Sequence, residues 1–158
     1  MKTVKRRSQK QEKGVAKSFN AKTTPASGAK WAQKGDVRNE KFLIECKTTE
    51  KDFYSITTKV WEKIHLEAMK DHGRIPLLII DLHDTDRYVV FRPQDFSTEV
   101  NTYECSVHGG CASYKFNGYS DEGLPLLFSL KPVKMKVQNH VLMVMTYHDF
   151  QEIFKEEL

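Results

Sequence analysis

The chain has 158 residues, 39% of them hydrophobic and 29% charged, which is typical of a water-soluble globular protein with one core. It contains no run near the roughly 20 apolar residues that a membrane span requires. Its basic N-terminus lacks the apolar segment of a secretory signal. Three cysteines, few and odd in number, do not indicate the disulfide framework of a secreted protein. We therefore expect one intracellular domain over residues 1–158.

The net charge of +4 hides an asymmetry along the chain. The first 34 residues contain ten lysines and arginines and one acid, Glu12, whereas the remainder contains 15 basic and 20 acidic residues. A basic segment on a mildly acidic body suits a polyanionic partner such as nucleic acid. A solvated tail without a partner is the alternative.

The N-terminal third is predicted to hold one helix and a loop. Residues 1–7 resemble a flexible basic leader, and a helix from Ser8 to about Phe19 would have Ser8 as its N-cap, with Gln11 or Glu12 close to the capping-box position. The run Thr-Thr-Pro-Ala-Ser-Gly within residues 20–29 is typical of a loop.

The middle of the chain alternates between predicted strands and a helix. An extended segment begins at residue 36, residues 38–41 form a polar turn, and residues 42–47 return as a strand. A helix over residues 57–71 is expected from the apolar stripe Val60, Trp61, Ile64 and Ala68. Gly73 is a natural stop for this helix.

Strands are expected again after this helix. The apolar run 76–82 predicts a strand buried on both faces, and residues 87–92 predict the next one. A hairpin over residues 102–116 and strands at 126–130 and 141–146 follow, and a closing helix is expected at 148–158. The fold class is therefore α/β, with a mixed central sheet flanked by helices and a β-rich C-terminal extension.

Charged side chains collect at the strand over residues 42–47. Because side chains alternate between the faces of a strand, Leu43, Glu45 and Lys47 share one face. The other face carries only apolar side chains: Phe42, Ile44 and Cys46. Asp36 precedes Glu45 by nine positions, and a tight turn between the two segments would bring Asp36 beside Glu45.

Two carboxylates and a lysine at one strand end suit the hydrolysis of a phosphodiester. Carboxylates hold a hard divalent cation, which polarises the phosphate and acidifies a bound water. The lysine can orient or deprotonate that water, or neutralise charge that develops in the transition state. The alternative is an edge-strand Glu–Lys pair beside an unrelated aspartate, an arrangement of little energetic value.

Gly35-Asp36, followed by Glu45-Cys46-Lys47 in an apolar strand, resembles the signature of PD-(D/E)xK nucleases. The predicted element order resembles that family's αβββαβ core, over residues 8–96. The string from Ser27 to Thr49 resembles phage and archaeal Holliday-junction-resolvase-like members. Residues 97–158, the C-terminal extension, carry no such resemblance.

The resemblance implies a role for each residue of the motif. Asp36 and Glu45 would be metal ligands, joined by the backbone carbonyl of Cys46, and Lys47 would be the catalytic lysine. The metal would be Mg²⁺ or Mn²⁺.

Two residues before the motif also receive roles from the resemblance. Glu12 would match the acidic residue of the first helix, which reaches the metal, and Ser27 would match the loop serine near the scissile phosphate. The chain departs from the pattern at the proline that gives the family its name, because Gly35 stands there instead.

Basic residues near the motif are candidates for contacts with DNA phosphates. This set comprises Lys5, Arg6, Arg7, Lys10, Lys30, Lys34 and Lys59. Lys63 lies one helical turn after Lys59, and a solvated helix face is the alternative for both.

Cys105, His108 and Cys111 invite a zinc interpretation, with His140 or His148 as a fourth ligand. Their spacing fits two other interpretations as well. The two cysteines could form a reversible disulfide across a hairpin, or could be chemically inert.

Together these features predict a Mg²⁺- or Mn²⁺-dependent endonuclease that acts on DNA in the cytoplasm, or in the host cytoplasm if a phage encodes it. The resemblance favours a Holliday junction resolvase, which would act on four-way junctions as a homodimer. The alternatives are a restriction- or repair-type endonuclease, a non-catalytic DNA-binding protein that retains the fold, and a phage protein that binds a host protein.

Overall fold

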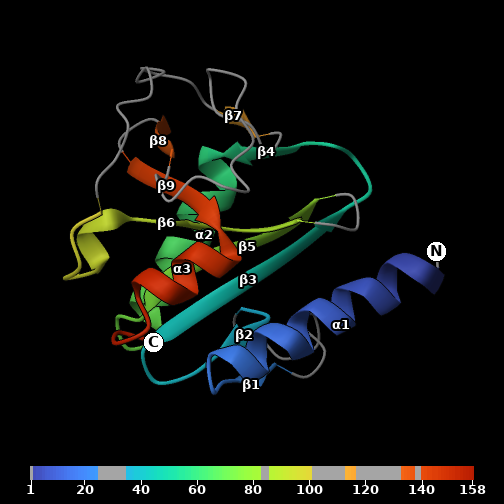
Figure 1. Ribbon diagram of the computed structural model, residues 1–158, viewed down its shortest axis with the longest axis horizontal. Helices are drawn as coiled ribbons and strands as arrows, with labels where there is room; N and C mark the ends of the chain where they lie inside the picture. Colours follow the sequence, from blue (N-terminus) through green and yellow to red (C-terminus); the bar gives the residue numbers. More distant parts are fainter. Residues whose placement is uncertain (1, 25–34, 83–85, 101–112, 117–132, 138–139) are drawn as a thin grey trace.

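The computed structural model describes residues 2–24, 35–82, 86–100, 113–116, 133–137 and 140–158. Its centre is a seven-stranded sheet with helices on both faces (Figure 1). The strand order in this sheet is β1-β2-β3-β5-β6-β9-β8, and β4 and β7 form a separate two-stranded sheet. The predicted mixed α/β sheet flanked by helices is therefore confirmed.

The first helix, α1 (Lys2–Ser18), begins earlier than the sequence pattern indicated. The prediction of a flexible leader over residues 1–7 with a helix start at Ser8 is wrong. The Ser8 hydroxyl donates to the Glu12 carboxylate at 3.0 Å, one turn later within the helix, and caps nothing. The lysines, arginines and glutamines around Ser8 are good helix formers, which is a physical reason for the helix to continue toward the N-terminus.

A hairpin follows α1 and leads into the central strand. β1 (Lys22–Thr23), β2 (Val37–Arg38) and β3 (Phe42–Thr49) pair antiparallel, with Val37 opposite Ile44. Asn39 shapes the turn, because its side-chain oxygen accepts hydrogen bonds from the backbone nitrogens of Lys41 and Phe42 at 3.0 and 2.7 Å. The predicted turn over residues 38–41 is confirmed.

The helix after this hairpin matches its prediction to within a residue. β4 (Tyr54–Thr57) leads into α2 (Thr58–Lys70), whose N-cap Thr57 accepts from the Val60 nitrogen at 3.2 Å. Gly73, just beyond the helix, has a positive φ of 69°, as a helix stop requires. β5 (Ile75–Leu82) then pairs parallel with β3, and β6 (Asp86–Phe91) pairs antiparallel with β5.

The C-terminal extension contributes strands to the same sheet. The 3₁₀ turn η1 (Pro93–Asp95) is followed by β7 (Ser113–Phe116), β8 (Val133–Val137), β9 (His140–Thr146) and α3 (Tyr147–Ile153). β9 pairs with β6, and β8 pairs with β9.

The structure confirms only some of the elements predicted for the C-terminal extension. The helix predicted over 148–158 ends earlier, at Ile153. Of the hairpin predicted over 102–116, only β7 is described, and it pairs with β4. The strand predicted at 126–130 lies outside the described residues.

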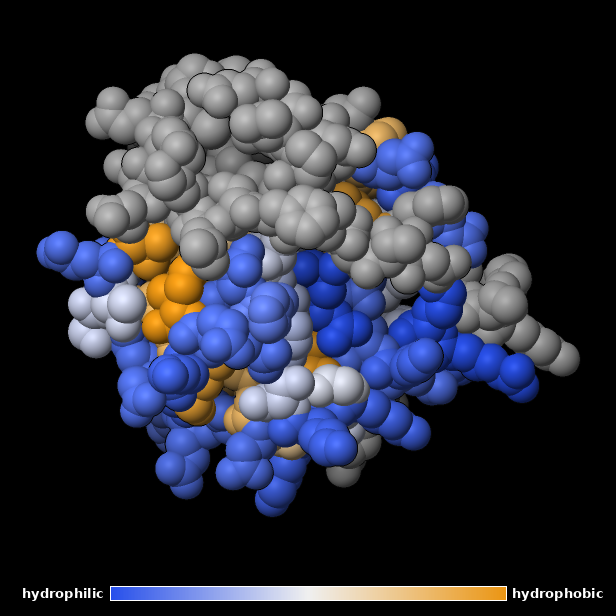
Figure 2. Space-filling view, in the orientation of Figure 1, coloured by the Kyte–Doolittle hydropathy of each residue, from blue (hydrophilic) through white to orange (hydrophobic). Residues whose placement is uncertain are grey.

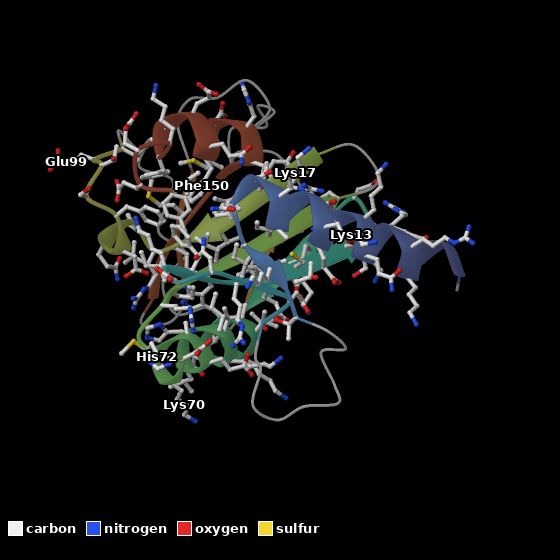
Figure 3. All side chains as sticks on the ribbon, turned by 90° about the horizontal axis from the view of Figure 1, so that it is seen from below. Lys13, Lys17, Lys70, His72, Glu99 and Phe150 are labelled. Carbon is white, nitrogen blue, oxygen red and sulfur yellow. The ribbon has the colours of Figure 1, made fainter. Side chains whose placement is uncertain are left out.

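A hydrophobic core lies on each face of the sheet. The first packs α2 against the sheet through Trp61, Ile64 and Ala68. The second lies under α1 and α3 and includes an aromatic cluster with ring centroids 4.5–5.6 Å apart, around Phe150 (Figure 3). That cluster consists of Phe91, Phe96, Phe150 and Phe154. The alternation predicted for β3 is confirmed, because Leu43 belongs to the first core, and Phe42, Ile44 and Cys46 belong to the second.

Candidate functional site

Asp36 is held at the edge of the sheet by its own backbone and by the residue before it. Its nitrogen donates to the Ile44 carbonyl at 3.0 Å, and its carbonyl accepts from the Thr24 nitrogen at 2.8 Å. Gly35 adopts a φ of +75°, and a Cβ there would lie 2.9 Å from Leu43 Cγ. Glycine is suited to this position because it adopts a positive φ readily and has no Cβ to collide with Leu43. Proline could not adopt this backbone conformation, because its ring fixes φ near −65°.

The Asp36 carboxylate turns toward β3. Its Oδ2 accepts a hydrogen bond from the backbone nitrogen of Cys46 at 2.8 Å. This bond places the carboxylate beside the residue that follows Glu45. The structure therefore brings Asp36 to the Glu45-Cys46-Lys47 segment, as the spacing predicted.

Glu45 and Lys47 form an ion pair on the α2 face of β3. Lys47 Nζ lies 2.7 Å from Glu45 Oε1. The Glu45 side chain is only 10% exposed, whereas that of Lys47 is 37% exposed, so the ammonium can meet solvent or a ligand. The pKa of Tyr54 on β4 is raised, first by burial, and the charges of Lys47 and Glu45 both affect it.

Within the part of the chain that the structure describes, Asp36 has no cationic partner of its own at this site, because Lys47 is paired with Glu45. The pKa of Asp36 is raised from 3.8 to about 6, first by burial and then by the negative charge of Glu45. The Cys46 N–H and the Lys47 charge act in the opposite direction but do not cancel these effects. The site therefore holds more negative charge than its burial favours.

Lys47 remains a cation in this arrangement. Burial alone lowers the pKa of its ammonium, but the hydrogen bond to Glu45 and the charges of Glu45 and Asp36 outweigh burial and raise it. Of the roles that the sequence left open for this lysine, charge neutralisation and hydrogen-bond donation therefore fit better than proton abstraction.

The donor set at this edge fits a hard divalent cation with water in its coordination shell. Among the described residues, no three Asp, Glu, His or Cys side chains gather closely enough to hold a metal ion. The site offers two carboxylates, those of Asp36 and Glu45. Mg²⁺ is commonly bound through one or two carboxylates while it keeps several waters, so this set suits it.

Glu12 lies near enough to the carboxylate pair for its charge to raise the pKa of Asp36. It lies on α1, which covers the face of the sheet opposite to Glu45 and Lys47. Its carboxylate accepts from the Ser8 hydroxyl at 3.0 Å, and its charge is the weakest of the five influences on the pKa of Asp36.

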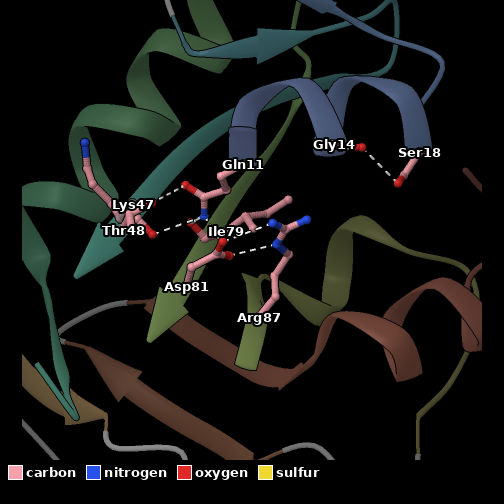
Figure 4. Close-up of polar contacts among 8 residues, drawn as sticks. All are labelled: Gln11, Gly14, Ser18, Lys47, Thr48, Ile79, Asp81 and Arg87. Carbon is pink, nitrogen blue, oxygen red and sulfur yellow. Dashed lines mark hydrogen bonds and ion pairs between the residues drawn. The ribbon is translucent and has the colours of Figure 1, made fainter. Parts of the chain in front are cut away.

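Gln11, which the sequence suggested only as a capping residue, connects α1 to the sheet. It is 1% exposed, and its amide bridges α1 to β3 and β5 (Figure 4). Its Nε2 donates to the Lys47 carbonyl at 3.1 Å and to Asp81 Oδ1 at 2.9 Å, and its Oε1 accepts from the Thr48 hydroxyl at 2.8 Å. Its spacing of four residues from Val15, in the buried stripe of α1, was the available signal.

Asp81 and Arg87 extend this network on the α1 face. Arg87 Nε and Nη2 donate to the two Asp81 carboxylate oxygens at 2.7 and 3.0 Å (Figure 4). The Arg87 guanidinium also lies 5.1 Å from the centre of the Tyr147 ring. The signal in the sequence was an aspartate inside the apolar run 76–82, because a charge there requires a partner.

The remaining predicted residues are spread over the surface or lie outside the description. Lys5, Arg6 and Lys10 are exposed on α1, and Lys59 is exposed on α2. Arg7 lies 3.8 Å from the Glu50 carboxylate. The residues outside the described part of the chain are Ser27, Lys30, Lys34, Cys105, His108 and Cys111.

Comparison with known proteins gives likenesses among solved structures. No protein-family model matches the sequence, and no characterised protein matches it either. Among solved structures, the chain is similar to Hjc, a Holliday junction resolvase from the archaeal hyperthermophile Archaeoglobus fulgidus, at 13% sequence identity and a TM-score of 0.45. The match covers 74% of this chain and 89% of that one, and it assigns no residue a role here.

None of the helices in the described part of the chain is long and apolar enough to cross a bilayer.

Proposed function

We propose that this chain is a nuclease that uses Mg²⁺ or Mn²⁺ to hydrolyse DNA phosphodiester bonds at the edge formed by Asp36, Glu45 and Lys47. One observation carries the proposal. Two carboxylates share a largely buried place beside a partly exposed lysine, and the pKa of one of them is raised to about 6. A divalent cation would relieve this excess of negative charge, and a nuclease needs one there.

The chain's own residues divide the work in this proposal. Asp36 and Glu45 would hold the cation with the Cys46 carbonyl, and the Cys46 N–H fixes the Asp36 carboxylate for that task. When bound, the cation supplies a polarised phosphate oxygen and a water of lowered pKa. The protonated Lys47 would donate to a phosphate oxygen and stabilise the charge that develops there during the reaction.

Within this class we propose a resolvase of four-way DNA junctions that acts as a homodimer. The support is the resemblance of residues 27–49 to resolvase-like nucleases, together with the symmetry of the substrate. A four-way junction presents two equivalent strands to cut, and a two-fold dimer presents two equivalent sites.

The test is cleavage of a labelled four-way junction beside a matched linear duplex, with Mg²⁺ and with EDTA. Wild type is compared with Glu45→Gln and with Glu40→Gln, an exposed carboxylate in the β2–β3 turn that serves as control. We expect paired, metal-dependent cuts near the crossover with wild type and Glu40→Gln, and none with Glu45→Gln.

The other outcomes separate the rival functions. Equal cutting of both substrates keeps the nuclease and favours a restriction- or repair-type enzyme over a resolvase. Binding without cutting by wild type overturns the enzyme and favours a non-catalytic DNA-binding protein.

A further inference from the structure

The solvent side of α1 carries a straight row of basic side chains. Its members follow one another at steps of four, three and four residues, so they lie on one line along the helix. They are all exposed, and we call them the basic stripe: Arg6, Lys10, Lys13 and Lys17. Figure 3 shows Lys13 and Lys17 on the outer side of α1.

The basic stripe lies opposite the buried side of the helix. The residues that fix α1 to the sheet are Gln11, Val15, Ala16 and Phe19, each at most 8% exposed. Glu12, the one acid in the first 34 residues, is half-buried and lies off the stripe. The stripe therefore contains positive charge alone.

Such a row is unfavourable for the helix itself. Like charges three or four residues apart repel each other, and α1 has no acidic residue in its first turn to favour its N-terminus. The exposed side of α2 differs, because Glu62 accompanies Lys59 and Lys63 there. A polyanion bound along α1 would convert this repulsion into attraction.

The form of the stripe fits a nucleic-acid backbone. From residue 6 to residue 17 a helix rises about 16 Å, and duplex DNA presents about one phosphate charge per 1.7 Å of its axis. The N-terminal half of α1 extends away from the body of the molecule, and this end is hydrophilic in the space-filling view (Figures 1 and 2).

A membrane surface is the less suitable partner for this helix. A helix that lies in a membrane interface exposes an apolar face to the lipid. The apolar face of α1 is occupied, since Val15 and Phe19 are 0% and 1% exposed in the core under the sheet.

The stripe is also fixed relative to the proposed cleavage site. Gln11, on the opposite side of the same helix, donates to the Lys47 carbonyl at 3.1 Å. The side chains of Glu45 and Lys47 project from the other face of that strand. Contacts along the stripe would therefore hold DNA at a set position without touching the reacting groups.

We propose that the basic stripe is a docking surface for the phosphate backbone of a DNA arm, one that contributes to affinity and takes no part in bond cleavage. This proposal rests on the proposed nuclease function for its biological meaning, but its binding test is independent of cleavage.

The experiment measures DNA binding in EDTA by fluorescence anisotropy over a series of salt concentrations. The stripe variant carries Arg6→Gln, Lys10→Gln, Lys13→Gln and Lys17→Gln. The control variant removes the same charge from four scattered, exposed lysines: Lys41, Lys51, Lys70 and Lys155. Circular dichroism checks that α1 stays folded, which we expect because glutamine is a good helix former.

We expect the stripe variant to bind on the order of 100-fold more weakly, with a slope of log K against log salt that is shallower by about three to four. The control should lose little affinity and keep the wild-type slope. Single-turnover cleavage by the stripe variant at saturating protein should stay at the wild-type rate.

The outcomes separate this proposal from the proposed function. If both variants lose DNA affinity equally, the basic stripe is not a specific docking surface, whether or not wild type cleaves DNA. A stripe-dependent salt slope in a protein that cleaves nothing keeps the stripe and removes the nuclease. A protein that binds anionic vesicles but no DNA overturns both.

Discussion

Two groups of charged side chains lie on opposite faces of the central sheet, and they are balanced differently. On the α1 face, the Asp81 carboxylate receives two hydrogen bonds from Arg87 and one from Gln11. On the α2 face and at the adjacent edge, Asp36 and Glu45 share the charge of one lysine, Lys47.

This difference separates a structural ion pair from a candidate active site. A structural pair satisfies its charges internally, because an uncompensated charge in a protein interior is costly. An active site keeps an imbalance that its ligand or metal completes, and such sites contain groups with perturbed pKa values. The Asp81–Arg87 pair fits the first description, and the Asp36–Glu45 pair fits the second.

The largest effect that we expect is on catalysis, from Lys47→Met. Removal of the ammonium should lower the single-turnover cleavage rate by about 10²–10³-fold, because one charged donor to the transition state is lost. The free energy of unfolding should also fall, by about 2 kcal/mol, because the Glu45 carboxylate, only 10% exposed, is left without its partner. Lys51→Met is the control, and a mutant that unfolds easily yet cleaves normally would place Lys47 among the structural residues.

The second effect is on stability, from Arg87→Met. The mutant leaves Asp81 with only its Gln11 bond, so we expect a loss of about 2 kcal/mol in urea denaturation, below the 3–5 kcal/mol of a fully buried pair because both side chains are partly exposed. Cleavage should be close to wild type at a temperature where both proteins are folded. Asp81→Asn in the same background should recover part of the loss. A large drop in cleavage without a loss of stability would contradict the assignment of the Asp81–Arg87 pair as structural.

The third effect has the opposite sign, in Asp36→Asn. The Asp36 carboxyl binds its proton more tightly in the folded chain, with a pKa of about 6, than in the unfolded chain, near 3.8. Wild type therefore gains stability from this group as the pH falls from about 6 toward 4, and the ionised group is unfavourable at pH 7. A shift of this size corresponds to about 3 kcal/mol, which we reduce to about 1–2 kcal/mol because Asp36 is partly exposed to solvent.

Asparagine cannot ionise and can still accept the Cys46 hydrogen bond. In EDTA at pH 7, Asp36→Asn should therefore be more stable than wild type in urea denaturation and should lose the part of the pH dependence between 4 and 6. Mg²⁺ should stabilise wild type and leave the mutant unchanged, because a cation that binds only the folded state adds stability by mass action. A less stable mutant in EDTA would show that the carboxylate is structurally required.

The sequence predicted most of what apolar periodicity controls. The limits of α2, the alternation along β3 and the approach of Asp36 to Glu45 follow from spacing, because core burial and strand pleating leave few alternatives. The start of α1 was mispredicted because an exposed basic segment has no apolar pattern, and its helix is supported by propensity and by the packing of its second half.

Polar networks were the other feature that spacing did not reveal. Gln11 meets Thr48 and Asp81 through the pairing of β3 with β5, contacts that join positions 37 and 70 residues away. No local pattern encodes such a meeting. The place of Glu12, on the opposite face from Glu45, likewise depends on which face α1 covers.

The smallest effect that we expect tests whether Arg87 serves structure alone. Gly14 lies inside α1, and a Cβ there would sit 3.6 Å from Arg87 Nη1, an ordinary contact. Gly14→Ala should therefore raise the free energy of unfolding by about 0.5–1 kcal/mol, because glycine is a poor residue in a helix interior. If Arg87 only neutralises Asp81, the methyl group beside its guanidinium should leave DNA affinity and cleavage unchanged. A more stable protein with weaker DNA binding would instead show that Arg87 contacts the substrate. The Asp81–Arg87 pair would then not be purely structural, and its contrast with the Asp36–Glu45 pair would be wrong.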